Sequence, residues 1–385
     1  MNKFLNYKDE FGIYIHIPFC RRKCSYCDFY SIKKKKKTLN KYLKSLKAEI
    51  QLYSHLLDNK KVKTIYIGGG TPSLLSSDDI ALLLNQIKDN FSLKNNIEIT
   101  MESNPDSLTE KKVIGFKNAG INRMSVGIQS FINKELNILG RVHNSKKSKN
   151  IIEILQKHIS NYNVDLMFAL PGQKFEDFQF SINKLIKYKP PHISLYNLQI
   201  EEGTLLYKQL KSGAIEAISE DLDYKMYNYA INELNNAGYN HYEISNFAKE
   251  NYESKHNIIY WNYKPYLGLG PSAHGFNGYS RYYNVNNLRD YMNKLSNNEF
   301  PIDNIINLSK NELISERMIM GLRLLDGIDR DVFKDRFNCS MESIYHDEIR
   351  KLKNQGLLTE DGNKIYLTKK GINLGNKVFL EFIID

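Results

Sequence analysis

The sequence has few cysteines and no long apolar run. Only 4 of its 385 residues are cysteine, and three of these lie together between residues 20 and 27. This argues against a framework of structural disulfides and for a reducing compartment. No stretch approaches the roughly 18 apolar residues that a membrane-spanning helix needs, and residues 1–12 lack the apolar segment of a secretory signal. We therefore expect a cytoplasmic protein without a transmembrane segment.

Acidic residues are fewer than basic ones, which gives a formal net charge of +11. Such a charge is typical of nucleic-acid binding, but the basic residues are spread along the chain. The one concentrated run, Lys33–Lys37, is explained by a solvated loop; an electrostatic contact with an anionic partner or a membrane face is the alternative. We expect no nucleic-acid partner, while peripheral membrane contact stays open.

Six short runs rich in β-branched residues alternate with amphipathic stretches in the first 238 residues. The runs cover residues 11–17, 62–68, 97–103, 122–128, 163–170 and 192–200. Repeated βα units predict a parallel sheet. Polar and glycine-rich motifs follow most of these runs, as they do in barrel-type α/β proteins, but a complete barrel needs eight units. We predict an α/β fold with a TIM-like partial (β/α)6 barrel over residues 1–238.

The remaining chain has a different character. Residues 239–305 are aromatic-rich and are expected to form an irregular connecting region. In residues 306–385, three helical patterns at 309–323, 329–337 and 341–355 precede a predicted hairpin at 356–371, with its turn signal at Asp361-Gly362. This order predicts a winged-helix-like α+β module. Many such modules bind DNA, but the absence of a concentrated arginine face favours an interaction role.

The clustered cysteines Cys20, Cys24 and Cys27 have the spacing C-x3-C-x2-C. Three thiolates do not pair into disulfides, and they leave a tetrahedral zinc ion one ligand short. Thiolates also select iron–sulfur clusters. A four-iron cluster on three cysteines keeps one iron open for a ligand that binds through an amine and a carboxylate. A zinc site with His16 or a distant residue as fourth ligand is the alternative.

This loop, which follows the first predicted strand, resembles the radical S-adenosylmethionine (SAM) superfamily. There the open iron holds the methionine end of SAM, and one electron from the cluster cleaves SAM to a 5′-deoxyadenosyl radical. The stretch from Gly68 to Pro72 resembles the superfamily's glycine-rich segment, although a tight turn alone would also explain its glycines. The resemblance implies a [4Fe-4S] cluster with exchangeable SAM.

Within the superfamily, the chain resembles the oxygen-independent coproporphyrinogen III oxidase family over most of its length. The matching motifs are IYIHIPFC, GGGTPS, ESNPDSL, RMSVGIQSF, LGRVH and VDLMFALPGQ. The resemblance implies SAM contacts at Tyr14, Tyr26, Gly69, Gly70, Thr71, Glu102, Gln129, Arg141 and Asp165. Carboxylates such as Glu102 and Asp165 can accept from ribose hydroxyls or an ammonium group, and Arg141 can pair with a carboxylate.

Two departures set the chain apart from the oxidases. The oxidases have a further cysteine two places after the third one, where this chain has Phe29. They also carry a longer N-terminal extension. By contrast, the segment H-N-x-x-Y-W, which contains His256, Asn257, Tyr260 and Trp261, resembles the signature of the haem-chaperone subfamily, HemW.

The resemblance to this subfamily implies that the H-N-x-x-Y-W segment binds haem. A neutral imidazole such as that of His256 is a natural ligand of haem iron, and Tyr260 and Trp261 can stack on a porphyrin. Aromatic packing beneath a loop is the alternative for this segment, and His274 in GPSAHGF is a rival iron ligand. Cys339, far from the cluster in sequence, is expected to be a buried free thiol.

The favoured hypothesis is a haem chaperone that carries a cluster and SAM and hands haem to an acceptor protein, a respiratory haem protein being one candidate. This role requires no turnover, so no catalytic residue is assigned. The alternative is an enzyme that dehydrogenates coproporphyrinogen III propionates through the 5′-deoxyadenosyl radical. A third hypothesis is a zinc-stabilised nucleic-acid-binding or interaction protein.

Overall fold

Six parallel strands form the centre of the computed structural model, which describes residues 10–57 and 60–384. They are adjacent in the order β1, β4, β5, β6, β7, β8. Their bounds are β1 (Glu10–Ile17), β4 (Lys61–Gly69), β5 (Ser92–Ser103), β6 (Arg123–Gln129), β7 (Tyr162–Phe168) and β8 (His192–Asn197). Every predicted strand is present, and the predicted partial barrel is confirmed.

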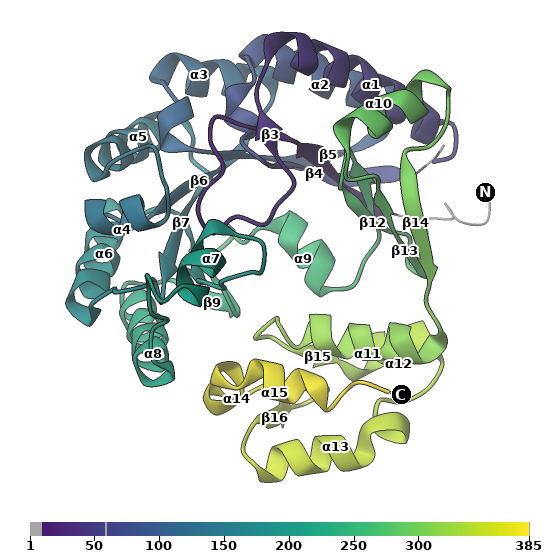
Figure 1. Cartoon of the computed structure of the whole chain (residues 1–385). Coiled ribbons are helices and arrows are strands. Elements are labelled where there is room, and N and C mark those ends of the chain that lie inside the picture. Colours follow the sequence, from purple (N-terminus) through teal and green to yellow (C-terminus); the bar gives the residue numbers. More distant parts are fainter. Residues whose placement is uncertain (1–9, 58–59, 385) are drawn as a thin grey trace.

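Helices cover the outer face of this curved sheet (Figure 1). They are α1 (Lys36–Ser54), α2 (Ser77–Asn90), α3 (Glu110–Ala119), α4 (Asn133–Ile138), α5 (Ser145–His158), α6 (Phe175–Tyr188) and α8 (Glu220–Asn236). Helix α7 (Leu205–Lys211) instead lies beside residues 20–27, where the Leu206 N–H donates to the Ser25 carbonyl. The strands are buried on both faces, as is typical of parallel sheets; every residue of β6, for example, is buried. Side-chain caps fix the helix starts, such as the reciprocal capping box of Ser76 and Asp79 on α2.

Residues 239–305 are not the irregular connection that the sequence indicated. They extend the sheet at both edges to twelve strands: β9 (Asn240–Glu243) and β10 (Asn246–Ala248) beyond β8, and β11 (Tyr266–Leu269), β12 (His274–Phe276), β13 (Ser280–Asn284) and β14 (Ile302–Asn307) beyond β1. The expectation was wrong because these strands are only three to six residues long, so their periodicity is weak. The same region forms α9 (Lys255–Trp261) and α10 (Leu288–Ser296).

Helix α9 lies in the opening of the barrel (Figure 1). It can pack closely because β1 carries Gly12, where a Cβ atom would stand 3.1 Å from both the His256 ring and the Ile259 side chain. The helix therefore places the H-N-x-x-Y-W segment against the inner side of the sheet.

The C-terminal residues form a module with its own apolar core. Its elements are α11 (Lys310–Gly321), β15 (Ile328–Asp329), α12 (Arg330–Phe337), α13 (Glu342–Asn354), β16 (Leu358–Asp361), β17 (Lys364–Leu367), α14 (Lys369–Asn373) and α15 (Gly375–Leu380). Helices α11, α12 and α13, together with the antiparallel sheet β15-β17-β16, match the predicted winged-helix-like arrangement. Cys339 packs against this core, only partly buried.

Contacts join the module to the barrel beside α9. The Tyr263 hydroxyl donates to Glu316 of α11 at 2.7 Å, and Arg336 of α12 donates to the Tyr263 carbonyl at 2.8 Å. The module thus closes one side of the barrel opening (Figure 1). Within the described part of the chain, no helix combines the length and the apolar character needed to cross a bilayer.

Candidate functional site

The cysteine loop lies at the carboxyl end of β1 and is anchored from several sides. Cys20 belongs to β2 (Phe19–Cys20), which pairs with β3 (Ile32–Lys33). The Ser25 N–H donates to the Leu139 carbonyl at 3.0 Å, and the Ser25 carbonyl accepts from Leu206 N–H at 2.9 Å. The loop is thereby fixed between β6–α5 and the segment after β8, with its three free thiols half-buried.

The Cys27 thiol is poorly suited to remain a metal-free anion. Burial, together with the neighbouring Cys24 and Cys20, raises the pKa of Cys27 to about 11. Bound iron would supply the compensating positive charge, and thiolates are the ligands of iron–sulfur clusters. The donor set therefore fits a cluster, in which each cysteine binds a different iron.

A single-ion zinc site does not fit this loop. No three His, Cys, Asp or Glu side chains within residues 10–57 and 60–384 are arranged to hold one metal ion. Both ring nitrogens of His16 are also engaged: Nδ1 lies 3.1 Å from the Tyr14 hydroxyl and Nε2 lies 2.9 Å from the Tyr30 carbonyl oxygen. His16 is therefore not a free fourth ligand.

The glycine-rich stretch after β4 packs directly on the base of the cysteine loop. Gly69 has a φ of +106°, and a Cβ atom there would stand 2.7 Å from the His16 ring; one on Gly70 would stand 2.7 Å from the Phe19 carbonyl oxygen. Only glycine fits these two positions without displacing the loop. The backbone is thus exposed to the space beside the cysteines, as SAM binding would require.

Several predicted SAM-site residues meet in one polar set. The Thr71 hydroxyl lies 3.5 Å from Cys20 Sγ and accepts from Asn104 Nδ2 at 3.0 Å. Asn104 Oδ1 accepts from Arg141 Nη2 at 2.6 Å. Arg141 Nη1 is 3.5 Å from both Cys24 Sγ and the Tyr26 hydroxyl. Arg141 therefore places its positive charge beside the thiols.

Asn104, which links this set, was missed in the sequence. It lies two residues after Glu102, in the ESNPD segment that follows the predicted third strand. Its position at a strand end was the available signal.

The carboxylates Glu102 and Asp165 lie deep in the same end of the barrel. Glu102 accepts from the Tyr66 hydroxyl at 2.8 Å and from the Gly69 N–H at 3.1 Å. Burial raises the pKa of Glu102 to about 7, with Asp165 adding to the effect. Burial likewise raises the pKa of Asp165 to about 6, against hydrogen bonds from Asn163 and neighbouring serines. Both carboxyl groups can therefore accept a hydrogen bond from a hydroxyl or ammonium group of a ligand.

Gln129 and Tyr14 complete the predicted set. Gln129 has a φ of +66°, and its buried Oε1 has no hydrogen-bond partner within the described residues. A strained backbone with an unsatisfied acceptor points to a ligand position. Tyr14 stacks on Tyr66 with 6.2 Å between ring centroids. These two residues extend the site along the inner face of β1, β4 and β6.

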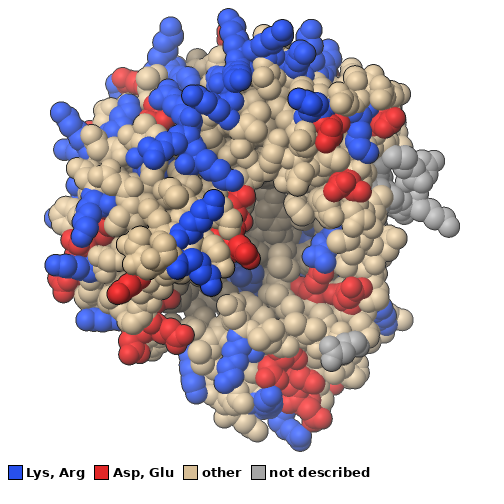
Figure 2. Space-filling model, viewed as in Figure 1, with Lys and Arg blue, Asp and Glu red and all other residues tan. Residues whose placement is uncertain are grey.

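A cavity of about 810 Å³ opens beside the cysteine loop; Figure 2 shows the hollow in the middle of this face. Its walls come from three distant segments, residues 14–30, 260–281 and 316–320. Eight of the 17 lining residues are aromatic: Tyr14, Phe29, Tyr30, Tyr260, Trp261, Tyr263, Tyr266 and Phe276. The size falls within the roughly 300–1,000 Å³ of sites for organic ligands.

The H-N-x-x-Y-W segment divides between the cavity wall and the core behind it. Tyr260 and Trp261 line the cavity, whereas His256 is fully buried. His256 Nδ1 is 2.7 Å from Thr64 Oγ1, and Nε2 is 2.8 Å from the Tyr260 hydroxyl. Neither nitrogen is free for a ligand in the cavity.

Two further features mark His256 as part of the interior. Burial and the nearby Arg123 lower its pKa to about 3, so the ring is neutral. Asn257 lies one residue further along α9, where its backbone N–H donates to the Ser254 cap at 3.4 Å; it is not among the residues that line the cavity.

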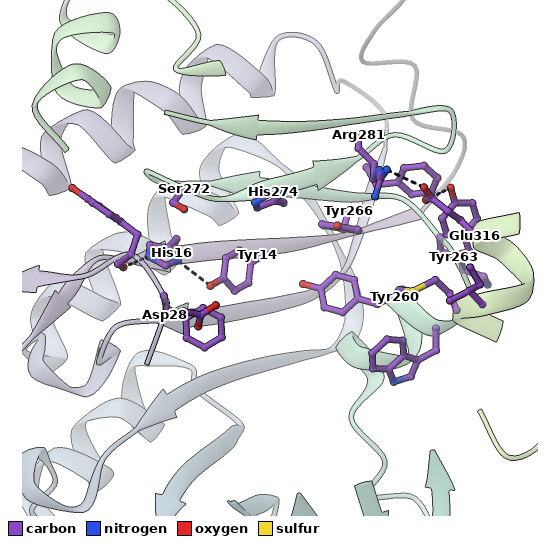
Figure 3. Close-up of a pocket in the computed structure, with 17 residues that line it drawn as sticks. Tyr14, His16, Asp28, Tyr260, Tyr263, Tyr266, Ser272, His274, Arg281 and Glu316 are labelled. Carbon is purple, nitrogen blue, oxygen red and sulfur yellow. Dashed lines mark hydrogen bonds and ion pairs between the residues drawn. The ribbon is translucent and has the colours of Figure 1, made fainter. Parts of the chain in front are cut away.

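Phe29 has a direct role in the cavity. Its side chain is 63% exposed and forms part of the wall. The residue that stands where the oxidases have a further cysteine therefore presents an apolar ring to the cavity. At the opposite end, Arg281 pairs with Glu316 at 3.0 Å (Figure 3), and Lys264 also lines the cavity.

Comparisons with known proteins identify the superfamily to which the chain belongs. Residues 14–185 match the family model of the radical SAM superfamily, and residues 308–374 match the HemN C-terminal domain. The fold is that of Escherichia coli coproporphyrinogen III oxidase (HemN), described as a radical SAM enzyme. The TM-score is 0.85 at 21% identity, over 99% of this chain and 92% of that one. The fold and the site thus define a radical SAM protein.

Two curated relatives are more similar in sequence. The haem chaperone HemW of Lactococcus lactis is 38% identical, with 97% of each chain covered. HemW of Bacillus subtilis is 34% identical, over 96% of this chain and 98% of that one. The chain belongs to the HemW family.

Proposed function

We propose that this protein is a haem chaperone that binds one haem in the aromatic cavity and passes it to an acceptor protein. The observation that carries the proposal is the cavity itself, because it has the volume of an organic-ligand site and eight aromatic side chains line it. Aromatic faces stack on a flat macrocycle. Arg281 and Lys264 at one end suit the two carboxylates of haem.

In this proposal, the H-N-x-x-Y-W segment supplies contact and support. Tyr260 and Trp261 contact the porphyrin from α9. His256 holds the Tyr260 hydroxyl from behind and keeps that ring at a fixed angle to the cavity. Asn257 belongs to the first turn of the same helix. It supports the site indirectly, by helping to hold α9 in place through its hydrogen bond to Ser254. Phe29 closes the side next to the cysteine loop.

We further propose that Cys20, Cys24 and Cys27 hold a [4Fe-4S] cluster and that SAM binds its open iron. The cluster would supply one-electron chemistry and a Lewis-acidic anchor for SAM. Arg141 offsets the thiolate charge, and Glu102 receives hydrogen bonds from the nucleoside or the ammonium group. Tyr14, Tyr26, Gly69, Gly70, Thr71, Gln129 and Asp165 complete the proposed SAM contacts.

The acceptor is a haem-binding protein, with respiratory haem proteins as the first candidates to test. The cytoplasm is the proposed compartment, since the three cluster thiols must stay reduced. The module of residues 306–385 is proposed as an interaction domain that packs against the barrel beside α9.

The proposal is tested by anaerobic titration of the reconstituted protein with hemin, run beside an assay with coproporphyrinogen III, SAM and a reductant. A saturable Soret band at one haem per chain, followed by loss of that band when an apo-acceptor is added, is the expected result. Formation of protoporphyrinogen IX in the parallel assay would instead identify an oxidase, and the chaperone proposal would be wrong.

A further inference from the structure

The cavity wall offers two imidazoles to a ligand, and they differ in availability. His16 lines the cavity, but it is only 5% exposed and both of its nitrogens are paired with Tyr14 and Tyr30. His274 is exposed and also lines the cavity. Within residues 10–57 and 60–384, its ring nitrogens form no hydrogen bond; its ring contact is with Tyr283, at 5.4 Å between centroids.

The hydroxyl groups of the cavity tyrosines are weaker candidates as iron ligands. The Tyr260 hydroxyl is engaged with His256, that of Tyr263 donates to Glu316 at 2.7 Å, and that of Tyr30 accepts from the Leu288 N–H at 2.9 Å. Burial raises the pKa of Tyr266 to about 12, which disfavours the tyrosinate that iron would require. His274 is therefore the nitrogen donor with no competing contact.

The backbone holds His274 in a rigid position. It begins β12 and pairs with Tyr283 of β13, and a Cβ atom on Gly268 of β11 would stand 1.9 Å from the His274 carbonyl oxygen. The close approach of these strands fixes the peptide, so the ring is presented from a sheet and not from a mobile loop. Figure 3 shows it midway along the cavity, between Ser272 and Tyr266 and facing Tyr14.

We propose that His274 is the axial ligand of the haem iron, and that His256 is a buried residue that positions Tyr260. This inference rests on the proposed haem-binding function and assigns the iron bond within it. A neutral imidazole is the commonest protein ligand of haem iron. In this assignment, the residue that binds the iron lies outside the H-N-x-x-Y-W motif.

The test is a hemin titration of the wild type and of His274→Ala, followed by Soret absorption and by electron paramagnetic resonance of the ferric form. We expect the affinity of His274→Ala to fall at least about tenfold, since even the loss of an outer partner of a metal ligand costs that much. The Soret band should also move. Added free imidazole should restore the wild-type spectrum by filling the vacated position, which a merely structural role would not allow.

Two control variants sharpen the result. His346→Ala removes an exposed histidine of α13 and should leave affinity and spectrum unchanged. His256→Ala should lower the thermal midpoint, while the haem that it binds keeps the wild-type Soret position. A wild-type spectrum and affinity in His274→Ala, or a ligand change in His256→Ala alone, would overturn the inference. Failure of the wild type to bind one haem per chain would instead refute the proposed function.

Discussion

The strand ends around the cysteines and the aromatic cavity beside them are built differently, although they meet at residues 28–30. At the strand ends, most polar residues lie at or just after a strand that the sequence reveals, as Cys20 and Thr71 do, and Arg141 joins them from the segment after α4. The cavity instead combines loops, an added edge of the sheet and one helix of the C-terminal module. Candidate residues at parallel strand ends can therefore be proposed from the sequence, although Asn104 was missed, whereas the cavity needs the tertiary structure.

The largest expected effect is the loss of the cluster from the cysteine loop while the aromatic cavity keeps its hemin binding. Cys27→Ala removes one of three cluster ligands and should abolish iron–sulfur absorption and bound iron after anaerobic reconstitution, because a cluster with two protein thiolates is not retained. Hemin binding should persist, since the cavity wall is unchanged. Cys339→Ala, which removes the remaining cysteine, is the control and should keep the cluster. Full cluster content in Cys27→Ala would contradict the assignment.

Loss of one carboxylate charge should weaken SAM binding without affecting haem. For Glu102→Gln we expect a loss of roughly 10- to 150-fold in SAM affinity, the usual worth of about 1.5–3 kcal/mol for a hydrogen bond to a charged group. Isothermal titration of the reconstituted protein measures it. Glu153→Gln, at an exposed position of α5, is the matched control.

The pH dependence of the same titration provides a second check. The pKa of Glu102 is about 7 in the SAM-free protein, and the ionised form is the better acceptor. SAM affinity should therefore rise as the pH increases through about 7 in the wild type and change less in Glu102→Gln. Equal pH profiles would show that Glu102 does not contact SAM.

Filling the cavity should weaken hemin binding and leave SAM binding unchanged. Met320→Trp adds bulk to the wall contributed by α11, and overpacking of about 1–3 kcal/mol would lower hemin affinity roughly 5- to 150-fold. Cluster content and SAM affinity should not change. Leu380→Trp adds the same ring at a surface position that is 66% exposed and should bind hemin normally. Unchanged hemin affinity in Met320→Trp would place haem elsewhere.

A smaller effect is expected where the added sheet edge joins the barrel. Glu49 of α1 is fully buried and accepts from the Gly270 N–H at 2.8 Å, Asn284 Nδ2 at 2.7 Å and the Tyr291 hydroxyl at 2.6 Å. Burial raises the pKa of Glu49 well above the usual range of a glutamate, to about 7. The folded state therefore holds the proton more tightly than the unfolded chain.

The stability contributed by this proton is fully present below the unfolded pKa and is lost as the pH rises through about 7. Urea unfolding at about pH 5 and about pH 8 should show a fall in stability that is smaller in Glu49→Gln than in the wild type. An identical fall in both proteins would remove Glu49 as its cause.

The sequence predicted the barrel because its strands and helices are long enough to show a clear pattern, and it predicted the C-terminal module because three helical patterns precede a hairpin turn signal at Asp361-Gly362. It failed for β9–β14, whose strands are short. The motif histidine shows the same limit: the sequence marks His256, but only the structure reveals that Thr64 and Tyr260 occupy its nitrogens. A motif identifies a family without stating which of its side chains faces the ligand.

Phe29 illustrates what could be learned before the structure was known. In the sequence, its place in the cysteine loop is where the chain departs from the pattern of the oxidase family that it resembles. The structure adds that the ring lines the cavity, so this position also shapes the proposed haem site. The contributions of Tyr263, Tyr266 and Phe276 had no motif to reveal them beyond the aromatic richness of their region.

The most direct test of the account is to locate iron in crystals of the reconstituted, haem-loaded protein by anomalous scattering at the iron edge. We predict two separate iron centres, one at Cys20, Cys24 and Cys27 and the other inside the aromatic cavity beside the His274 ring. A second centre outside this cavity, or one bonded to His256, would contradict the account.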